Sequence, residues 1–148
     1  MGTTAGDLLR DKGTGVESIT ATETVLEAIR RMADKHIGCL AVVTKTGKLA
    51  GILSERDCLW KVVGPGGSPK TRLVKEAMTP RSQMMTVAPD QSVEECMALI
   101  TGRRHRHLPV LAGEKLVGLI SIGDIVKALL DAQQATIQSL EKYITGTF

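Results

Sequence analysis

The sequence predicts an α/β (α+β) protein built from two copies of one β-α-β-β-α unit and a long C-terminal helix. Two observations support this prediction: a ten-residue segment occurs twice, and the helix and strand patterns before each copy follow the same order. The segment from Lys48 to Asp57 returns 67 residues later, from Lys115 to Asp124, with five of ten positions identical. The apolar positions that differ stay apolar, so the repeat indicates a duplicated structure.

Each copy contains a helix that begins with a capping box. Thr24 precedes Glu27 and Ser92 precedes Glu95, so each has an N-cap hydroxyl and a glutamate three residues later. Apolar or small residues then recur at the spacing of one buried helix face. These residues are Val25, Ala28, Ile29, Met32 and Ala33 in the first copy, and Val93, Cys96, Met97, Ile100 and Thr101 in the second.

Strands are predicted after each of these helices. The apolar runs are residues 39–43 and 49–53 in the first copy and 107–111 and 116–120 in the second, with short β segments around 18–20 and 85–87 and preludes at 5–9 and 74–78. We therefore divide the chain into a first unit (5–63), a Gly- and Pro-rich linker (64–73), a second unit (74–131) and a helical tail (132–148). A unit of about 50 residues is too small to bury a secure core alone, so the two units should pack together.

Composition excludes several classes of protein. No run of about 18 apolar residues exists, and the N-terminus has no apolar signal core, so we expect neither a membrane span nor secretion. The three cysteines are widely spaced and fit no metal motif, which favours buried thiols in a reducing cytoplasm. A net charge of +3 and a single Phe, Tyr and Trp provide no aromatic platform for single-stranded nucleic acid.

Each repeat ends in Gly-h-h-Ser-x-x-Asp (h apolar), at a predicted strand-to-helix turn. The hydroxyl and the first helical N–H groups suit a phosphate, because a helix N-terminus exposes unpaired donors. The carboxylate suits the hydroxyls of a ribose. The alternative is that Ser and Asp only cap the helix, as these residues often do.

Two such units in tandem resemble a pair of cystathionine-β-synthase-type (CBS) domains, over roughly residues 5–130. The closest likeness is to small stand-alone CBS pairs of bacteria and plant organelles, through Met78-Thr79, the segment from Arg104 to Val110, Ser121-Ile122-Gly123-Asp124 and the helical tail. The resemblance implies a pseudo-twofold Bateman module with a cleft on each side and pairing of two modules in a flat homodimer.

The resemblance also implies the binding residues. Asp57 and Asp124 would hold ribose, and Ser54 and Ser121 would face phosphate. Arg56 would support the phosphates of the first cleft, where the second has Gly123, so the clefts would be unequal. Adenine would be enclosed by aliphatic side chains and read by the backbone. The residues concerned are Ile19, Thr20, Gly38, Cys39 and Leu40 in the first unit, and Thr86, Val87, Arg106, His107, Leu108 and Pro109 in the second.

The densest basic run is Arg103-Arg104-His105-Arg106-His107. It could be a solvated helix end, where cations meet the negative pole of the helix dipole. Alternatively, Arg106 and His107 could meet phosphate at the start of a strand. The pair His105 and His107 is a weak metal signal without further ligands, and we expect no metal site.

These observations favour a non-catalytic cytoplasmic regulator that needs no cofactor, binds AMP, ADP, ATP or NAD, and acts on an unidentified partner protein. No P-loop or positioned nucleophile indicates an enzyme. The alternatives are a nucleic-acid-binding protein with a basic surface, and a detached regulatory subunit of an enzyme such as a nucleotide-metabolism dehydrogenase. The tail beyond residue 130 carries an apolar stripe at helical spacing, for which subunit contact is the natural role.

Overall fold

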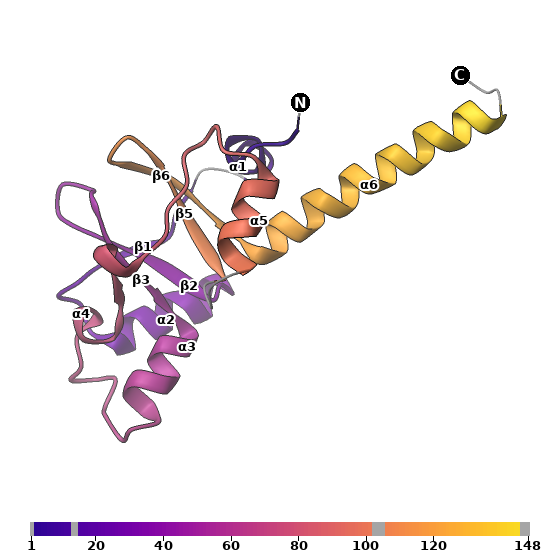
Figure 1. Cartoon of the computed structure of the whole chain (residues 1–148). Coiled ribbons are helices and arrows are strands. Elements are labelled where there is room, and N and C mark those ends of the chain that lie inside the picture. Colours follow the sequence, from indigo (N-terminus) through magenta and orange to yellow (C-terminus); the bar gives the residue numbers. More distant parts are fainter. Residues whose placement is uncertain (1, 13–14, 102–105, 146–148) are drawn as a thin grey trace.

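The computed structural model describes residues 2–12, 15–101 and 106–145. In chain order the first half contains α1 (Ala5–Lys12), β1 (Ser18–Thr20), α2 (Val25–Lys35), β2 (Cys39–Val43), β3 (Leu49–Ser54), α3 (Glu55–Asp57) and the π-helix η1 (Cys58–Val63). The second half contains α4 (Val74–Ala77), β4 (Thr79–Pro80), η2 (Arg81–Gln83), α5 (Val93–Thr101), β5 (His107–Ala112), β6 (Lys115–Ser121) and α6 (Ile122–Thr145). The predicted mixed α and β architecture with a long C-terminal helix is confirmed (Figure 1).

The two sheets show the duplication in their pairing. The first has the order β1-β2-β3-β4, with β1 parallel to β2 and the other pairs antiparallel. The second is the antiparallel pair β5-β6. A parallel bridge between Val87 and Val110 repeats the pairing of Ile19 with Val42, so the predicted segment 85–87 survives as a single bridge rather than a strand.

The short helices before the two units cross over. Helix α1 packs into the core of the second unit through Ala5, Leu8 and Leu9. Helix α4 packs into the core of the first unit through Val74 and Ala77. The crossing is reinforced by matching backbone hydrogen bonds of 2.8–3.0 Å: Ala5 N to Gln91 O, Gly6 N to Pro89 O and Val93 N to Thr3 O on one side, and Val25 N to Arg72 O, Val74 N to Glu23 O and Lys75 N to Ala21 O on the other. Each unit therefore completes its core with a segment that precedes the other unit.

The repeated glycines explain how these segments approach so closely. A Cβ on Gly51 would lie 2.5 Å from the Thr79 carbonyl oxygen, and one on Gly118 would lie 2.4 Å from Leu9 Cδ2. Both positions face the crossed-over segment, and only glycine leaves room for it there. The glycine of each repeat thus serves packing between the units.

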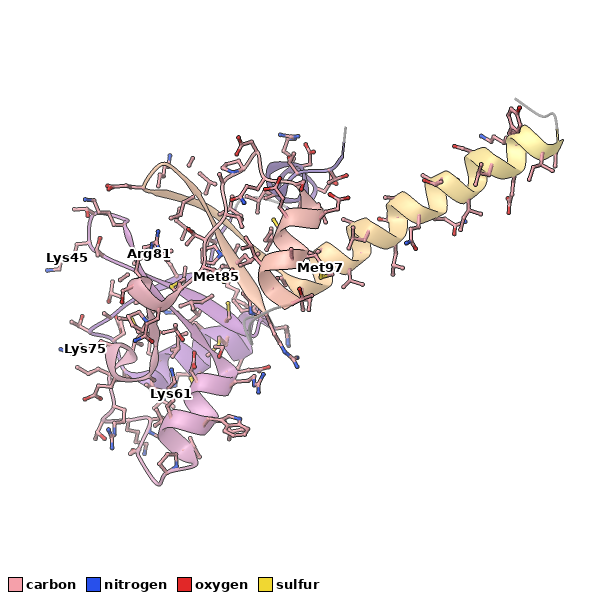
Figure 2. All side chains as sticks on the ribbon, in the orientation of Figure 1. Lys45, Lys61, Lys75, Arg81, Met85 and Met97 are labelled. Carbon is pink, nitrogen blue, oxygen red and sulfur yellow. The ribbon has the colours of Figure 1, made fainter. Side chains whose placement is uncertain are left out.

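A third apolar cluster joins the two units. Ala41, Leu49 and Leu111 are buried together, and the turns of the two hairpins meet in a bridge between Lys48 and Lys115. Met85 and Met97 pack at the edge of the second core (Figure 2). Among the helices of the described residues, none combines the length and apolar character that a membrane crossing requires.

Candidate functional site

Both Ser-x-x-Asp motifs form complete capping boxes. In the first, the Asp57 N–H donates to Ser54 Oγ (3.1 Å) and the Ser54 N–H donates to Asp57 Oδ2 (2.9 Å). In the second, the Asp124 N–H donates to Ser121 Oγ (3.1 Å) and the Ser121 N–H donates to Asp124 Oδ2 (2.8 Å). Capping is therefore a real role of these residues, and each box uses only one carboxylate oxygen.

The other oxygen of the first aspartate faces a lysine. Asp57 Oδ1 lies 3.2 Å from Lys61 Nζ, one helical turn further on, and the Asp57 side chain is 16% exposed. Lys61 also donates a hydrogen bond of 3.0 Å to the Ala77 carbonyl oxygen, which ties η1 to α4. The carboxylate is thus held in one position, and a sugar hydroxyl that binds there would share it with the ammonium group.

A cavity of about 510 Å³ brings this motif together with the second unit. This volume lies within the usual range for small-molecule sites. We call it the first cleft. Its lining residues are Gly38, Ile52, Ser54, Glu55, Arg56, Asp57, Trp60, Thr79, Arg106 and His107. Six of the seventeen predicted site residues line this one cavity: Gly38, Ser54, Arg56, Asp57, Arg106 and His107.

The first cleft lies beside the beginnings of β2 and β5, which are equivalent strands of the two units. The Glu55 N–H donates to the Gly38 carbonyl oxygen (2.9 Å), and the Ile122 N–H donates to the Arg106 carbonyl oxygen (2.8 Å). Gly38 and Arg106 are therefore equivalent positions of the two units, and both line the same cavity. Cationic groups from distant parts of the chain, on Arg56 and Arg106, are gathered beside Asp57, which is an arrangement suited to a ligand with anionic and sugar parts.

The residues predicted to surround the adenine base, apart from the three that line the first cleft, lie mostly in the cores. Ile19, Leu40, Val87 and Leu108 are at most 2% exposed, Cys39 is 4% exposed and Pro109 is also buried. Thr20 and Thr86 are half-buried. None of these eight lines the first cleft, and their role in reading a base stays a prediction.

Sequence reasoning missed Trp60, Thr79, Ile52 and Glu55 in this cavity. Trp60 follows Asp57 by three residues, and residues three apart share a helix face, so its position was available from the sequence. Its side chain is 69% exposed, which places a large aromatic surface at the cavity wall. Thr79 comes from β4, whose pairing with β3 left no signal in the sequence.

The second motif has different surroundings. Asp124 lines a cavity of about 530 Å³ between α1 and α6, and Ser121 and Gly123 are not among its lining residues. That lining consists of Thr3, Leu8, Asp11, Asp124, Lys127, Ala128, Asp131 and Ala132. Three carboxylates and one lysine make this cavity a poor match for phosphate. The position equivalent to Arg56 is Gly123, so the second motif lacks that cation.

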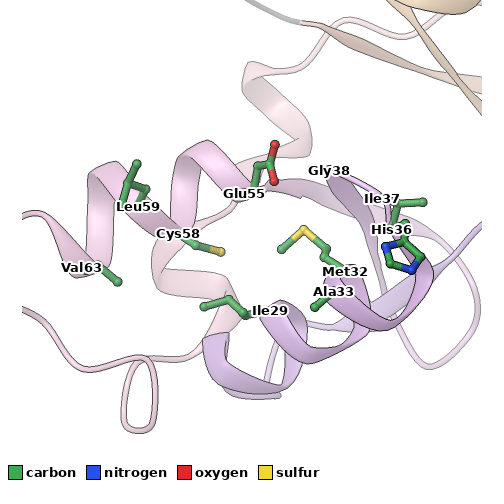
Figure 3. Close-up of a pocket in the computed structure, with 10 residues that line it drawn as sticks. All are labelled: Ile29, Met32, Ala33, His36, Ile37, Gly38, Glu55, Cys58, Leu59 and Val63. Carbon is green, nitrogen blue, oxygen red and sulfur yellow. The ribbon is translucent and has the colours of Figure 1, made fainter.

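An apolar groove of about 510 Å³ lies on the outer side of the first unit, between α2 and the helix formed by α3 and η1 (Figure 3). Met32 and Cys58 point into it from facing helices (Figure 3). Burial, followed by the charge of Asp57, raises the pKa of the Cys58 thiol to about 11. Burial and then Glu95 also raise the pKa of Cys96. All three cysteines are buried and form no disulfide, as predicted, and the raised pKa values lower the thiolate fraction of Cys58 and Cys96 at neutral pH.

The basic run falls partly outside the description. Arg103, Arg104 and His105 lie outside the described residues, while Arg106 is exposed and His107, half-buried, begins β5. Within the described ranges, no group of three or more His, Cys, Asp or Glu side chains is arranged to hold a metal ion.

Two repeats that each end in Ser-x-x-Asp and that share one cavity define a tandem module. The CBS domain family matches residues 5–64 and 74–131, and the chain belongs to this family. It is 36% identical over 153 residues to the "CBS domain-containing protein CBSX3, mitochondrial" of Arabidopsis thaliana, a match that covers 99% of this chain and 74% of that protein.

Solved structures agree. A protein with CBS domains from Burkholderia ambifaria has 46% identity and a TM-score of 0.82, covering 88% of this chain and 96% of that one. A hexameric CBS-CP12 protein from bloom-forming cyanobacteria has 31% identity and a TM-score of 0.75, covering 85% of this chain and 71% of that one. CBS pairs are regulatory modules that commonly bind nucleotides, are generally non-catalytic and form oligomers.

Proposed function

We propose that this protein is a non-catalytic sensor that binds an adenosine nucleotide in the first cleft and passes the resulting change to a regulated partner protein. The observation that supports the proposal best is the composition of that cavity, which combines Ser54, Arg56 and Asp57 of the first unit with Arg106 and His107 of the second. A ligand that contacts residues of both units would link the position of one unit to that of the other.

The two arginines favour a ligand with phosphate groups, opposed by the carboxylates of Glu55 and Asp57 that also line the cavity. Arg56 and Arg106 are both exposed side chains on the cavity wall, and guanidinium groups bind phosphate through paired donors. At the second motif, Gly123 stands in the position of Arg56. We therefore propose that one ligand binds per chain and that ATP and ADP bind more tightly than AMP, with NAD as the further candidate.

Several finer points belong to the same proposal. Residues 5–63 and 74–131 form the two units, joined by 64–73, with α1 and α4 exchanged between their cores. The base readers named from the resemblance supply adenine selectivity. The protein is a homodimer in a reducing cytoplasm, which agrees with three buried free thiols, whereas its Arabidopsis relative is mitochondrial.

Calorimetric titration with ATP, ADP, AMP, NAD and GTP tests the proposal. We expect one site per chain, with ATP tighter than AMP and GTP weaker than ATP. Hydrogen bonds to charged groups contribute about 1.5–3 kcal/mol, so Arg106→Gln should weaken ATP binding by roughly ten- to a hundredfold. Arg30→Gln is the matched control, because Arg30 is exposed on α2, outside the cavity lining, and its loss changes the net charge equally.

Asp57→Asn separates ribose binding from capping. Asparagine keeps a side-chain oxygen that can accept from the Ser54 N–H, and the lost ion pair with the half-exposed Lys61 is worth about 0–1 kcal/mol, so stability should change little while nucleotide affinity falls. Asp124→Asn should affect affinity less. No binding of any adenosine nucleotide at millimolar concentration, or equal affinities for the Arg106→Gln and Arg30→Gln variants, would show that the first cleft is not a nucleotide site.

A further inference from the structure

The distal half of α6 leaves the body of the protein with an apolar stripe uncovered. Every side chain of residues 130–145 is exposed, and Figures 1 and 2 show this part of the helix standing apart from all other elements. Leu130 is 59% exposed, Ile137 47%, Leu140 57% and Ile144 81%. Such a concentration of exposed large aliphatic side chains marks an interaction surface.

This segment needs a partner in order to be a stable helix. Residues 130–145 span about 24 Å at 1.5 Å per residue. Isolated helices of that length are marginal in water, and most helices in proteins are stabilised by packing of one face. The remaining part of α6 has such packing, because Ile125 is buried in the second core and α1 and α5 contact the helix.

The stripe has the spacing of a coiled coil. Its members are separated alternately by four and three residues and occupy successive d and a positions of a heptad: Val126 (d), Leu130 (a), Gln133 (d), Ile137 (a), Leu140 (d) and Ile144 (a). Its distal part, with Ile137 and Ile144 at a and Leu140 at d, has the combination that favours a parallel two-stranded coiled coil. The occupant with a matching stripe is therefore a second copy of this chain.

We propose that α6 pairs with α6 of a second copy in a parallel, in-register coiled coil over residues 126–144. In this arrangement each Gln133 faces its own counterpart, and the two amides can hydrogen-bond to each other. In an antiparallel pairing the a positions pack against d positions, so Gln133 would instead face an aliphatic residue such as Ile137, where its amide would lose its partner. A polar residue at one core position thus selects the parallel register.

The flanking positions permit this pairing. In a parallel dimer each g position meets the e position five residues later on the partner, which gives the pairs Leu129 with Gln134 and Thr136 with Glu141. Neither pair joins like charges. The inference is independent of nucleotide binding, and it assigns the contact to α6 rather than to the bodies of the two modules.

Disulfide trapping in the full chain tests the proposal. Leu140→Cys places a thiol at a core d position, where the twofold axis brings two copies within disulfide range. Ser139→Cys is the matched control, because position 139 points away from the seam. The native cysteines are buried and should not contribute. Under mild oxidation of the purified protein, we expect Leu140→Cys to give a cross-linked species of twice 15.8 kDa at least tenfold faster than Ser139→Cys.

A second substitution checks the mechanism. Added to Leu140→Cys, Ile137→Glu should slow cross-linking at least tenfold, whereas Gln138→Glu, with the same added charge on the outer face, should leave the rate nearly unchanged. Circular dichroism verifies that each variant is folded. Equal cross-linking of the 139 and 140 variants, no cross-linking at all, or equal effects of the two glutamates would overturn the proposal. A dimer seen by light scattering in the absence of cross-linking would place the subunit contact on the bodies of the two modules. The outcome of the cross-linking experiment does not depend on the outcome of the nucleotide titration.

Discussion

The crossed packing of α1 onto the second unit predicts the effect of Gly118→Ala. The added Cβ would lie 2.4 and 2.6 Å from the two methyl carbons of Leu9, far inside normal contact distance. Leu9 is only 3% exposed, so its side chain has little free space into which it can turn. Overpacking of this kind costs about 1–3 kcal/mol. Removal of a glycine from the unfolded chain offsets about 0.4–1 kcal/mol of that cost.

The net expectation is a loss of about 1–2 kcal/mol in the free energy of unfolding. At roughly 2–4 °C per kcal/mol for a chain of about 150 residues, the unfolding temperature should fall by about 2–8 °C. Urea denaturation followed by circular dichroism measures the first quantity, and a thermal scan measures the second. The slope of the urea transition should stay constant, because the variant exposes the same surface on unfolding.

A double-mutant cycle makes the test specific for the contact. Leu9→Ala alone should cost about 2–5 kcal/mol through the cavity that it leaves. In the double variant the new methyl group occupies space that Leu9 vacated, so the combined loss should fall short of the sum by about 1 kcal/mol or more. If the two losses add within about 0.5 kcal/mol, α1 does not pack against Gly118 and the crossed arrangement is wrong.

Three further outcomes are expected. Gly51→Ala should destabilise the protein more than Gly118→Ala in the same urea assay, because its Cβ would meet the backbone oxygen of Thr79, which cannot rotate away; an equal or smaller loss would contradict this. Stability should fall as the pH rises from about 9 towards 11, because the Cys58 thiol ionises in the unfolded chain while the folded state keeps it protonated; Cys58→Ala should flatten that part of the profile, and an unchanged slope would assign it to other groups. Trp60 is the single tryptophan and lines the first cleft, so ATP should change its fluorescence in a saturable way that Arg106→Gln weakens; a constant signal at saturating ATP would place the ligand elsewhere.

The sequence was sufficient to predict most helices and strands, because the local signals are the same in the two repeats. The N-cap hydrogen bonds of the two predicted boxes form, with the Glu27 N–H donating to Thr24 Oγ1 and the Glu95 N–H donating to Ser92 Oγ, each at 3.1 Å. Most of the predicted apolar helix positions enter the two cores, whereas Ala33 and Thr101, at the ends of their predicted faces, are exposed. These features depend on residues three or four apart, which is the range over which a single sequence is informative.

The arrangement of the units could not be predicted in the same way. Nothing in the pattern of residues 5–9 or 74–78 indicates which unit each segment completes, because an apolar face does not specify its partner. The meeting of Asp57 with Arg106 in one cavity depends on that arrangement, as does the presence of Thr79 beside them. Sequence reasoning placed Arg106 with the base readers of its own unit, whereas the structure brings it to the motif of the other.

Helix α6 runs without interruption from the second Ser-x-x-Asp motif to the exposed end of the tail. It begins at the box formed by Ser121 and Asp124 and continues for 24 residues, about 36 Å. Over that length, a tilt of roughly 5° at the first turn displaces the last turn by about 3 Å. The helix therefore amplifies motion. A small change of angle at the second motif becomes a displacement of several ångströms at the exposed end of α6, where another molecule can bind.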